Sequence, residues 1–123
     1  MLGAARYGTR DLVRAKQFYD AIAGLLGAQR VLDRPEVVAY RGEQGGMFLI
    51  GRPLAGEPSV GNGTQMVLAA PSRTAVDAAH AKAIELGGSC EGPPGFRGPP
   101  ERGFYAAYFR DLDGNKLMVS HQG

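Results

Sequence analysis

The chain contains a single cysteine, Cys90, among its 123 residues, so it cannot form a disulfide bond within itself. Sparse cysteine fits a reducing compartment, and we expect a cytoplasmic protein. No apolar run approaches the length of a membrane span, and the opening sequence MLGAARYGTRDL holds no apolar segment of signal-peptide length. These absences predict a protein with no membrane partner and no secretion signal.

An excess of one charge is also absent, because 14 Lys and Arg residues face 12 Asp and Glu residues for a net charge of +2. The charges are scattered, and no basic stripe interleaved with aromatic side chains is present, so we expect no nucleic-acid partner. What is present is 44% hydrophobic residues, which suffices for the core of one ordinary domain. The 19 glycines and 8 prolines indicate many turns between short elements.

The pattern of the first half predicts one strand, one helix and three further strands. Residues 3–8 are a short candidate strand. From residue 11 to residue 26, apolar side chains recur with the three-four spacing of an amphipathic helix, and Thr9 or Asp11 can cap its first turn. Runs rich in Val, Ile, Tyr and Phe follow, with turn-forming residues between them, at 29–32, 37–41 and 47–50.

The second half repeats this order after a Gly- and Pro-rich segment at residues 51–63. The expected elements are a strand, a helix capped by Ser72, a short strand and a flexible loop, at residues 64–70, 73–86, 89–91 and 92–103. The chain then closes on a hairpin, because two apolar runs at 104–110 and 116–120 flank the turn-forming sequence DLDGN.

Each half is thus a strand-helix-strand-strand-strand module, and we predict a single α+β domain over residues 1–123, with modules at about 1–55 and about 63–123. The helix of each module covers one face of its sheet, and the other face needs a partner. Two modules side by side can curl those free faces into an open cup.

Several polar residues invite a functional interpretation, but their context favours structural roles. His80 lies on the apolar stripe of the second helix, His121 lies near the chain end, and Cys90 has no base close to it in sequence. The residues at 111, 113 and 115 have the one-three-five spacing of a calcium loop. Its sixth and twelfth positions hold Lys116 and Gln122 instead of Gly and Glu, so Asp111, Asp113 and Asn115 are interpreted as turn residues.

The sequence DLDGNKLMV at 111–119 resembles the closing hairpin of the vicinal oxygen chelate superfamily, the group of glyoxalases, bleomycin resistance proteins and extradiol dioxygenases. Three more segments resemble the same family in the same order, namely GTRDLVRAKQFYDAIAGLLGA, GMFLIGRPLAG and GNGTQMVLAAPSRTAVDAAHAKAIELGG. The resemblance covers nearly the whole chain and is strongest to bacterial members that carry two modules in one chain. It implies two βαβββ modules forming an open cup, and a possible homodimer, because members commonly pair or exchange modules.

The family's metal ligands are absent at the matching positions. The resemblance places the first two His ligands at Ala4 and Gln65, and the closing Glu at Met118. A fourth ligand, where used, falls among Met47–Ile50, which are all apolar. Divalent metals of the kind this family uses need imidazole or carboxylate donors. We therefore predict no metal or other cofactor, which puts glyoxalase-type isomerisation and dioxygenation in doubt.

A pocket for a small organic molecule is predicted from the side chains that would line the cup. If Ala4 faces the cup, strand alternation turns Arg6 the same way, where it could bind a carboxylate or phosphate, although an arginine reaching water is the alternative. Gln65 and Met118 would join it. Tyr105 and Tyr108 are the candidate aromatic residues, and the sequence leaves open which face of their strand lines the cup.

Three functions follow from these observations. The first is a glyoxalase/bleomycin-resistance-like protein that has lost its metal ligands and binds a small organic molecule in its cup. The second is a metal-dependent lyase or isomerase of the glyoxalase (lactoylglutathione lyase) type, with a divalent metal held by other residues. The third is a non-catalytic interaction module whose cup is filled by side chains, and a well-formed pocket would separate the first from the third.

Overall fold

A computed structural model describes the whole chain, residues 1–123. The first module comprises β1 (Ala4–Gly8), α1 (Leu12–Leu25), β2 (Gln29–Asp33), β3 (Val37–Arg41) and β4 (Met47–Gly51). The second comprises β5 (Met66–Ala69), α2 (Arg73–Glu85), β6 (Ser89–Phe96), a 3-10 turn at Pro100–Arg102, β7 (Phe104–Arg110) and β8 (Lys116–Gln122). The predicted repeat of strand, helix and three strands is confirmed.

Both modules build the same four-stranded sheet. The strand orders are β1-β4-β3-β2 and β5-β8-β7-β6. The pairs β1–β4 and β5–β8 are parallel, and all other pairs are antiparallel. The predicted hairpin is present, with Tyr108 opposite Met118 and Arg110 opposite Lys116. The two sheets share no strand pairing, so the cup stays open between them.

The strand β6 is longer than the sequence predicts. The prediction of a loop from residue 92 is wrong over its first part, because β6 continues to Phe96 and pairs with β7 through two register shifts. Pro93 and Pro94 have no backbone N–H to donate, which normally argues against a strand. They are accommodated here because β6 is an edge strand and because bulges interrupt its pairing.

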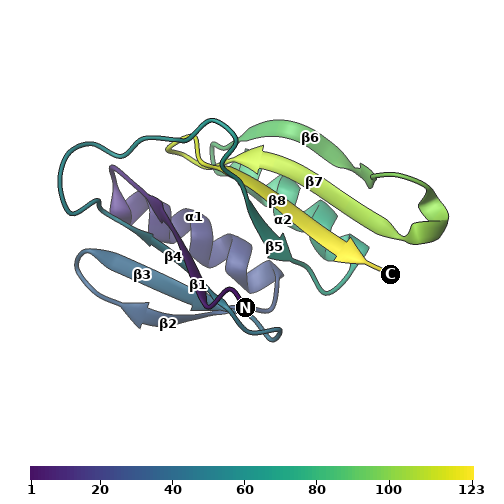
Figure 1. Cartoon of the computed structure of the whole chain (residues 1–123), viewed down its shortest axis with the longest axis horizontal. Coiled ribbons are helices and arrows are strands. Elements are labelled where there is room, and N and C mark those ends of the chain that lie inside the picture. Colours follow the sequence, from purple (N-terminus) through teal and green to yellow (C-terminus); the bar gives the residue numbers. More distant parts are fainter.

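The helices begin where the capping residues predict. Asp11 accepts a hydrogen bond from the backbone N–H of Arg14 at 3.2 Å, and Ser72 accepts one from that of Ala75 at 3.0 Å. Both helices lie behind the sheets in Figure 1, so each sheet presents one face to the viewer. No helix of the chain has the length and apolar character needed to cross a membrane.

One hydrophobic core joins the two modules. A cluster of 20 buried residues includes side chains of both helices and both sheets. The rings of Phe18 on α1 and Phe109 on β7 lie 6.2 Å apart, and both side chains are fully buried. The helix of the first module therefore packs against the sheet of the second, and the modules form a single unit.

Candidate functional site

The face of each sheet that points away from the helices is called its outer face here. On β1 and β4, Tyr7, Phe48 and Ile50 are buried against α1, so the alternate residues Ala4, Arg6, Met47 and Leu49 lie on the outer face. On β8, Leu117 and Val119 are fully buried, which places Lys116, Met118 and Ser120 on the outer face. Gln65 directly precedes β5 and has the same parity as the exposed Val67.

Of the five residues predicted to line the pocket, Arg6, Gln65, Tyr108 and Met118 lie on the outer faces. Tyr105 lies on the other side of β7. Its hydroxyl donates to Asp77 Oδ1 of α2 at 2.6 Å, and its ring packs edge-on against Phe96. The sequence left the parity of this strand open, and the structure resolves it in favour of Tyr108.

The residues at the family's metal-binding positions do not fit a divalent metal ion. Ala4, Gln65 and Met118 present a methyl group, an amide and a thioether on the outer faces, and none is an imidazole or a carboxylate. No group of three or more His, Cys, Asp and Glu side chains able to hold a metal occurs in the chain. The histidines lie elsewhere: His80 contacts Cys90 at 3.2 Å, and His121 contacts the carbonyl of Ala70 at 2.9 Å.

Arg6 lies on the outer face of the first sheet, with its guanidinium beside Gly51. Its Nη2 donates to the carbonyl of Arg52 at 2.6 Å, and the rest of the guanidinium is left without a protein partner. A Cβ atom on Gly51 would lie 2.8 Å from Nη2, so glycine at this position makes room for the arginine. The side chain is exposed yet held in one place by the backbone, which prepares it to bind an anion.

A second arginine is held in the same way on the other sheet. Arg97 donates through Nη2 to the carbonyl of Pro93 at 2.7 Å, and its guanidinium carbon lies 5.4 Å from the ring centre of Tyr108. Cβ atoms on Gly92 and Gly95 would each come within 3.2 Å of this guanidinium. Arg97 was not among the predicted pocket residues, because its position depends on the irregular pairing of β6.

The outer faces carry a strong excess of positive charge. Lys116 Nζ lies 5.6 Å from the ring centre of Tyr108, and the guanidinium of Arg97 contacts the same ring. The carboxylate of Glu91 is already paired with Arg110, whose guanidinium lowers the pKa of that carboxyl. Arg6, Arg97 and Lys116 have no acidic partner, so this surface favours negatively charged ligands.

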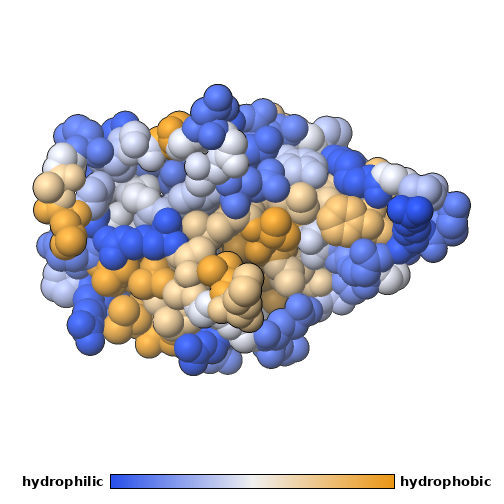
Figure 2. Space-filling model, viewed as in Figure 1, coloured by the Kyte–Doolittle hydropathy of each residue, from blue (hydrophilic) through white to orange (hydrophobic).

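Two cavities lie where the modules meet. One has a volume of about 230 Å³ and is mostly polar, with Arg6, Ser59, Thr64 and Lys116 in its lining. The other has a volume of about 350 Å³ and is mostly apolar, and it is formed chiefly by the turn between β3 and β4, the start of β4 and the end of β5. Figure 2 shows the apolar side chains gathered over the middle and lower part of this face, with hydrophilic side chains around them.

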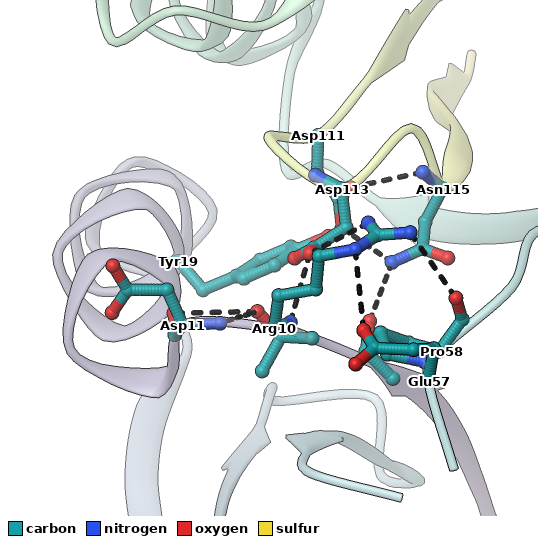
Figure 3. A network of polar contacts seen from close by, with 10 residues as sticks. Arg10, Asp11, Tyr19, Glu57, Pro58, Asp111, Asp113 and Asn115 are labelled. Carbon is teal, nitrogen blue, oxygen red and sulfur yellow. Dashed lines mark hydrogen bonds and ion pairs between the residues drawn. The ribbon is translucent and has the colours of Figure 1, made fainter.

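The Asp-Leu-Asp-Gly-Asn turn of the second module forms hydrogen bonds to the first module (Figure 3). The buried Tyr19 of α1 donates its hydroxyl hydrogen to Asp111 Oδ2 at 2.5 Å. Asn115 Nδ2 donates to the same oxygen at 2.9 Å and to the carbonyl of Gly8 at 3.0 Å. Burial raises the pKa of the Asp111 carboxyl, while the hydrogen bonds from Tyr19 and Asn115 lower it in part.

Further bonds hold the modules together at the same end. The backbone N–H of Arg10 donates to Asp113 Oδ1 at 2.9 Å, and the hydroxyl of Tyr7 donates to the carbonyl of Lys116 at 2.6 Å. The interpretation of Asp111, Asp113 and Asn115 as turn residues is confirmed, since Asp111 accepts from the backbone N–H groups of the other two. The turn also fixes β8, and with it Lys116, against the first module.

Comparison with known proteins gives a consistent result. The family model described as "Glyoxalase/Bleomycin resistance protein/Dioxygenase superfamily" matches residues 2–119. A glyoxalase/bleomycin resistance protein from Albidiferax ferrireducens T118 is 38% identical, with a TM-score of 0.90 over 100% of this chain and 99% of that one. No curated protein is significantly similar.

More distant structures share the fold alone. A glyoxalase-related enzyme from Fulvimarina pelagi is 19% identical, with a TM-score of 0.74 over 98% of this chain and 87% of that one. A lactoylglutathione lyase from Agrobacterium tumefaciens is 21% identical, with a TM-score of 0.66 over 98% of this chain and 92% of that one. The family match over almost the whole chain, together with the 38% identical structure, shows that this protein belongs to the glyoxalase/bleomycin resistance protein/dioxygenase superfamily.

Proposed function

We propose that this protein binds a small organic anion between its outer faces and uses no metal ion to do so. The observation that carries the proposal is the set of three outer-face cations that form no ion pair, Arg6, Arg97 and Lys116. A planar guanidinium can donate two parallel hydrogen bonds to a carboxylate or phosphate. A negatively charged ligand would be attracted to this positively charged surface, whereas a cation would be repelled.

Preorganisation supports the same conclusion. Long flexible side chains normally lose conformational entropy when they bind a ligand. Arg6 is already fixed by one hydrogen bond to a backbone carbonyl and Arg97 by two, and both lie over glycines. Their free N–H groups are therefore positioned before the anion arrives, and less binding energy is spent on ordering them.

The alternatives are less well supported. The A. tumefaciens lactoylglutathione lyase has the same fold, and a metal-dependent lyase or isomerase is the natural second candidate. That chemistry needs imidazole and carboxylate donors, which Ala4, Gln65 and Met118 do not supply. A non-catalytic module with a filled cup is disfavoured by the two cavities between the modules.

The first prediction concerns metal ions. We expect that nickel, zinc, manganese or iron(II) added to chelator-treated protein leaves the melting temperature unchanged. A ligand that binds only the native state raises stability, and these positions offer no imidazole or carboxylate to hold such a metal. A matched control is the triple variant Ala4→His, Gln65→His, Met118→Glu, which carries the family's donor types and should gain a metal-dependent rise. Stoichiometric metal in the unmodified protein, with a rise in melting temperature, would restore the lyase hypothesis.

The second prediction concerns the cations. Using benzoate as the probe and calorimetry as the readout, we expect Arg6→Gln and Lys116→Gln each to weaken binding about tenfold or more, since a hydrogen bond to a charged group contributes about 1.5–3 kcal/mol. Arg14→Gln, on the water-facing side of α1, should leave the affinity unchanged. Equal binding of benzoate and uncharged benzyl alcohol, or no effect of either substitution, would contradict an anion site.

A further inference from the structure

The two cavities lie near opposite ends of β1 and β5, and we call the strip of surface between these two strands the seam. The seam runs between β1 and β5, which lie side by side in the middle of Figure 1. At one end, residues Arg6, Tyr7 and Gly8 of β1 meet Thr64 before β5 in the lining of the polar cavity. At the other end, Leu2 before β1 meets Val67–Ala69 of β5 in the lining of the apolar cavity. A single ligand that follows the strands would reach both.

The polar end of the seam is built for a negative charge. Lys116 and Arg6 line it together with the hydroxyl-bearing Ser59 and Thr64, and no Asp or Glu is among the lining residues. Lysine and hydroxyl groups are donors to carboxylate and phosphate oxygens. The volume of about 230 Å³ suits a head group and is small for a complete ligand.

The apolar end has the opposite character. Nine of the fifteen residues around this cavity of about 350 Å³ are hydrophobic, among them Leu26, Met47 and Phe48. Glu43 is the only charged residue in its lining and would repel a second acidic group. Val67, which also lines this cavity, is 55% exposed and so leaves an apolar surface in contact with water.

We propose that the ligand is an amphipathic organic acid, with its acidic group at Lys116 and Arg6 and its apolar part lying along Val67 into the larger cavity. This inference rests on the proposed function and specifies the ligand class for it. The strand β5 from Met66 to Ala69 spans about 10 Å at about 3.3 Å per residue, so the apolar part is a chain or ring system of comparable length. Monoacids with a medium-length chain fit this description better than short or multiply charged acids.

The test is a chain-length series of simple acids measured by calorimetry below their micelle-forming concentrations. We expect decanoate to bind at least tenfold more tightly than hexanoate, and hexanoate more tightly than acetate, because each buried methylene strengthens binding about fourfold. Decylamine, with the same chain and the opposite charge, should bind at least tenfold more weakly than decanoate. Lys116→Gln should weaken all acids by a similar factor.

A cavity-filling variant tests whether the alkyl chain of the acid occupies the apolar cavity. Ala69→Phe places an aromatic ring in the larger cavity and should abolish the advantage of decanoate over acetate, while acetate binding stays unchanged. Ala81→Phe, at an exposed position on α2, is the matched control and should preserve the whole series.

The outcomes separate this inference from the proposed function. Acids of all lengths binding equally would overturn the amphipathic ligand and leave the anion site standing. Decanoate and decylamine binding equally, with no effect of Lys116→Gln, would overturn both. Absence of acid binding, together with a dimer in light scattering that Val67→Lys dissociates, would show that the seam is a contact between two copies of the chain.

Discussion

Phe109→Ala is expected to lower the free energy of unfolding by about 3–5 kcal/mol, which is the usual cost of removing a large side chain from a well-packed core. The Phe109 side chain is fully buried, and its ring lies 6.2 Å from that of Phe18 in the other module. The loss therefore opens a cavity at the point where α1 packs on the second sheet. Denaturant titration followed by circular dichroism measures the change.

The same experiment tests whether the modules fold together. Because one cluster of 20 residues spans both, we expect a single cooperative transition, shifted as a whole to lower denaturant concentration. Phe96→Ala is the matched control, since Phe96 is 37% exposed and its loss should cost about 1 kcal/mol or less. Two separate transitions, with the first module unaffected, would show that the shared core is not a single unit.

Asp111→Ala is expected to cost about 3 kcal/mol or more. Its carboxylate accepts hydrogen bonds from the Tyr19 hydroxyl, from the Asn115 side chain and from the backbone N–H groups of Asp113 and Asn115. Alanine would leave these donors without a partner, and each buried donor left unpaired costs about 1–3 kcal/mol. Tyr19→Phe removes only one of the bonds and should cost less.

An exposed carboxylate provides the control for this prediction. Asp33 forms ion pairs with Lys16 and Arg30 at the surface, and Asp33→Ala should change stability by about 1 kcal/mol or less, because water and salt screen such pairs. Equal effects of the Asp111 and Asp33 substitutions in thermal melts would refute the structural role of the turn.

The Tyr19–Asp111 bond also gives stability a dependence on alkaline pH. Burial, followed by the negative charge of Asp111, raises the pKa of Tyr19 well above its usual value of about 10. Above about pH 10, the unfolded chain releases the phenolic proton of Tyr19 while the folded chain keeps it. The free energy of unfolding therefore falls as the pH rises, by up to about 1.4 kcal/mol per pH unit for this group. Denaturant titrations of Tyr19→Phe should show a shallower decline above pH 10 than those of the unmodified protein.

Periodicity and turn chemistry predicted most of the fold because they depend on local sequence. The helix at α1 follows from its apolar spacing, and the β7–β8 hairpin follows from its turn residues. The extent of β6 could not be predicted in this way, because Pro93 and Pro94 argue against a strand and only the edge position of β6 permits it.

The candidate site was harder to predict than the fold. The alternation of side chains along each strand predicted that Arg6, Gln65 and Met118 face the cup. The strand Phe104–Arg110 is rich in apolar residues on both faces, so the sequence could not show whether Tyr105 or Tyr108 faces the cup. One face packs on α2, while on the other Arg97 lies over the Tyr108 ring. That contact depends on register shifts in β6, and the cavities depend on how the modules pack; neither has a local signature.

The polar bonds between the modules are all at one end of the seam. They join Tyr7, Arg10 and Tyr19, with the carbonyl of Gly8, to the turn at residues 111–116, next to the polar cavity. The apolar end is held by side-chain packing without such bonds. The position of Lys116 beside Arg6 is therefore fixed by hydrogen bonds between the modules, whereas the width of the larger cavity is set by side-chain packing alone. A substitution that alters packing at the far end is expected to change the shape of the larger cavity while the two cations keep their places.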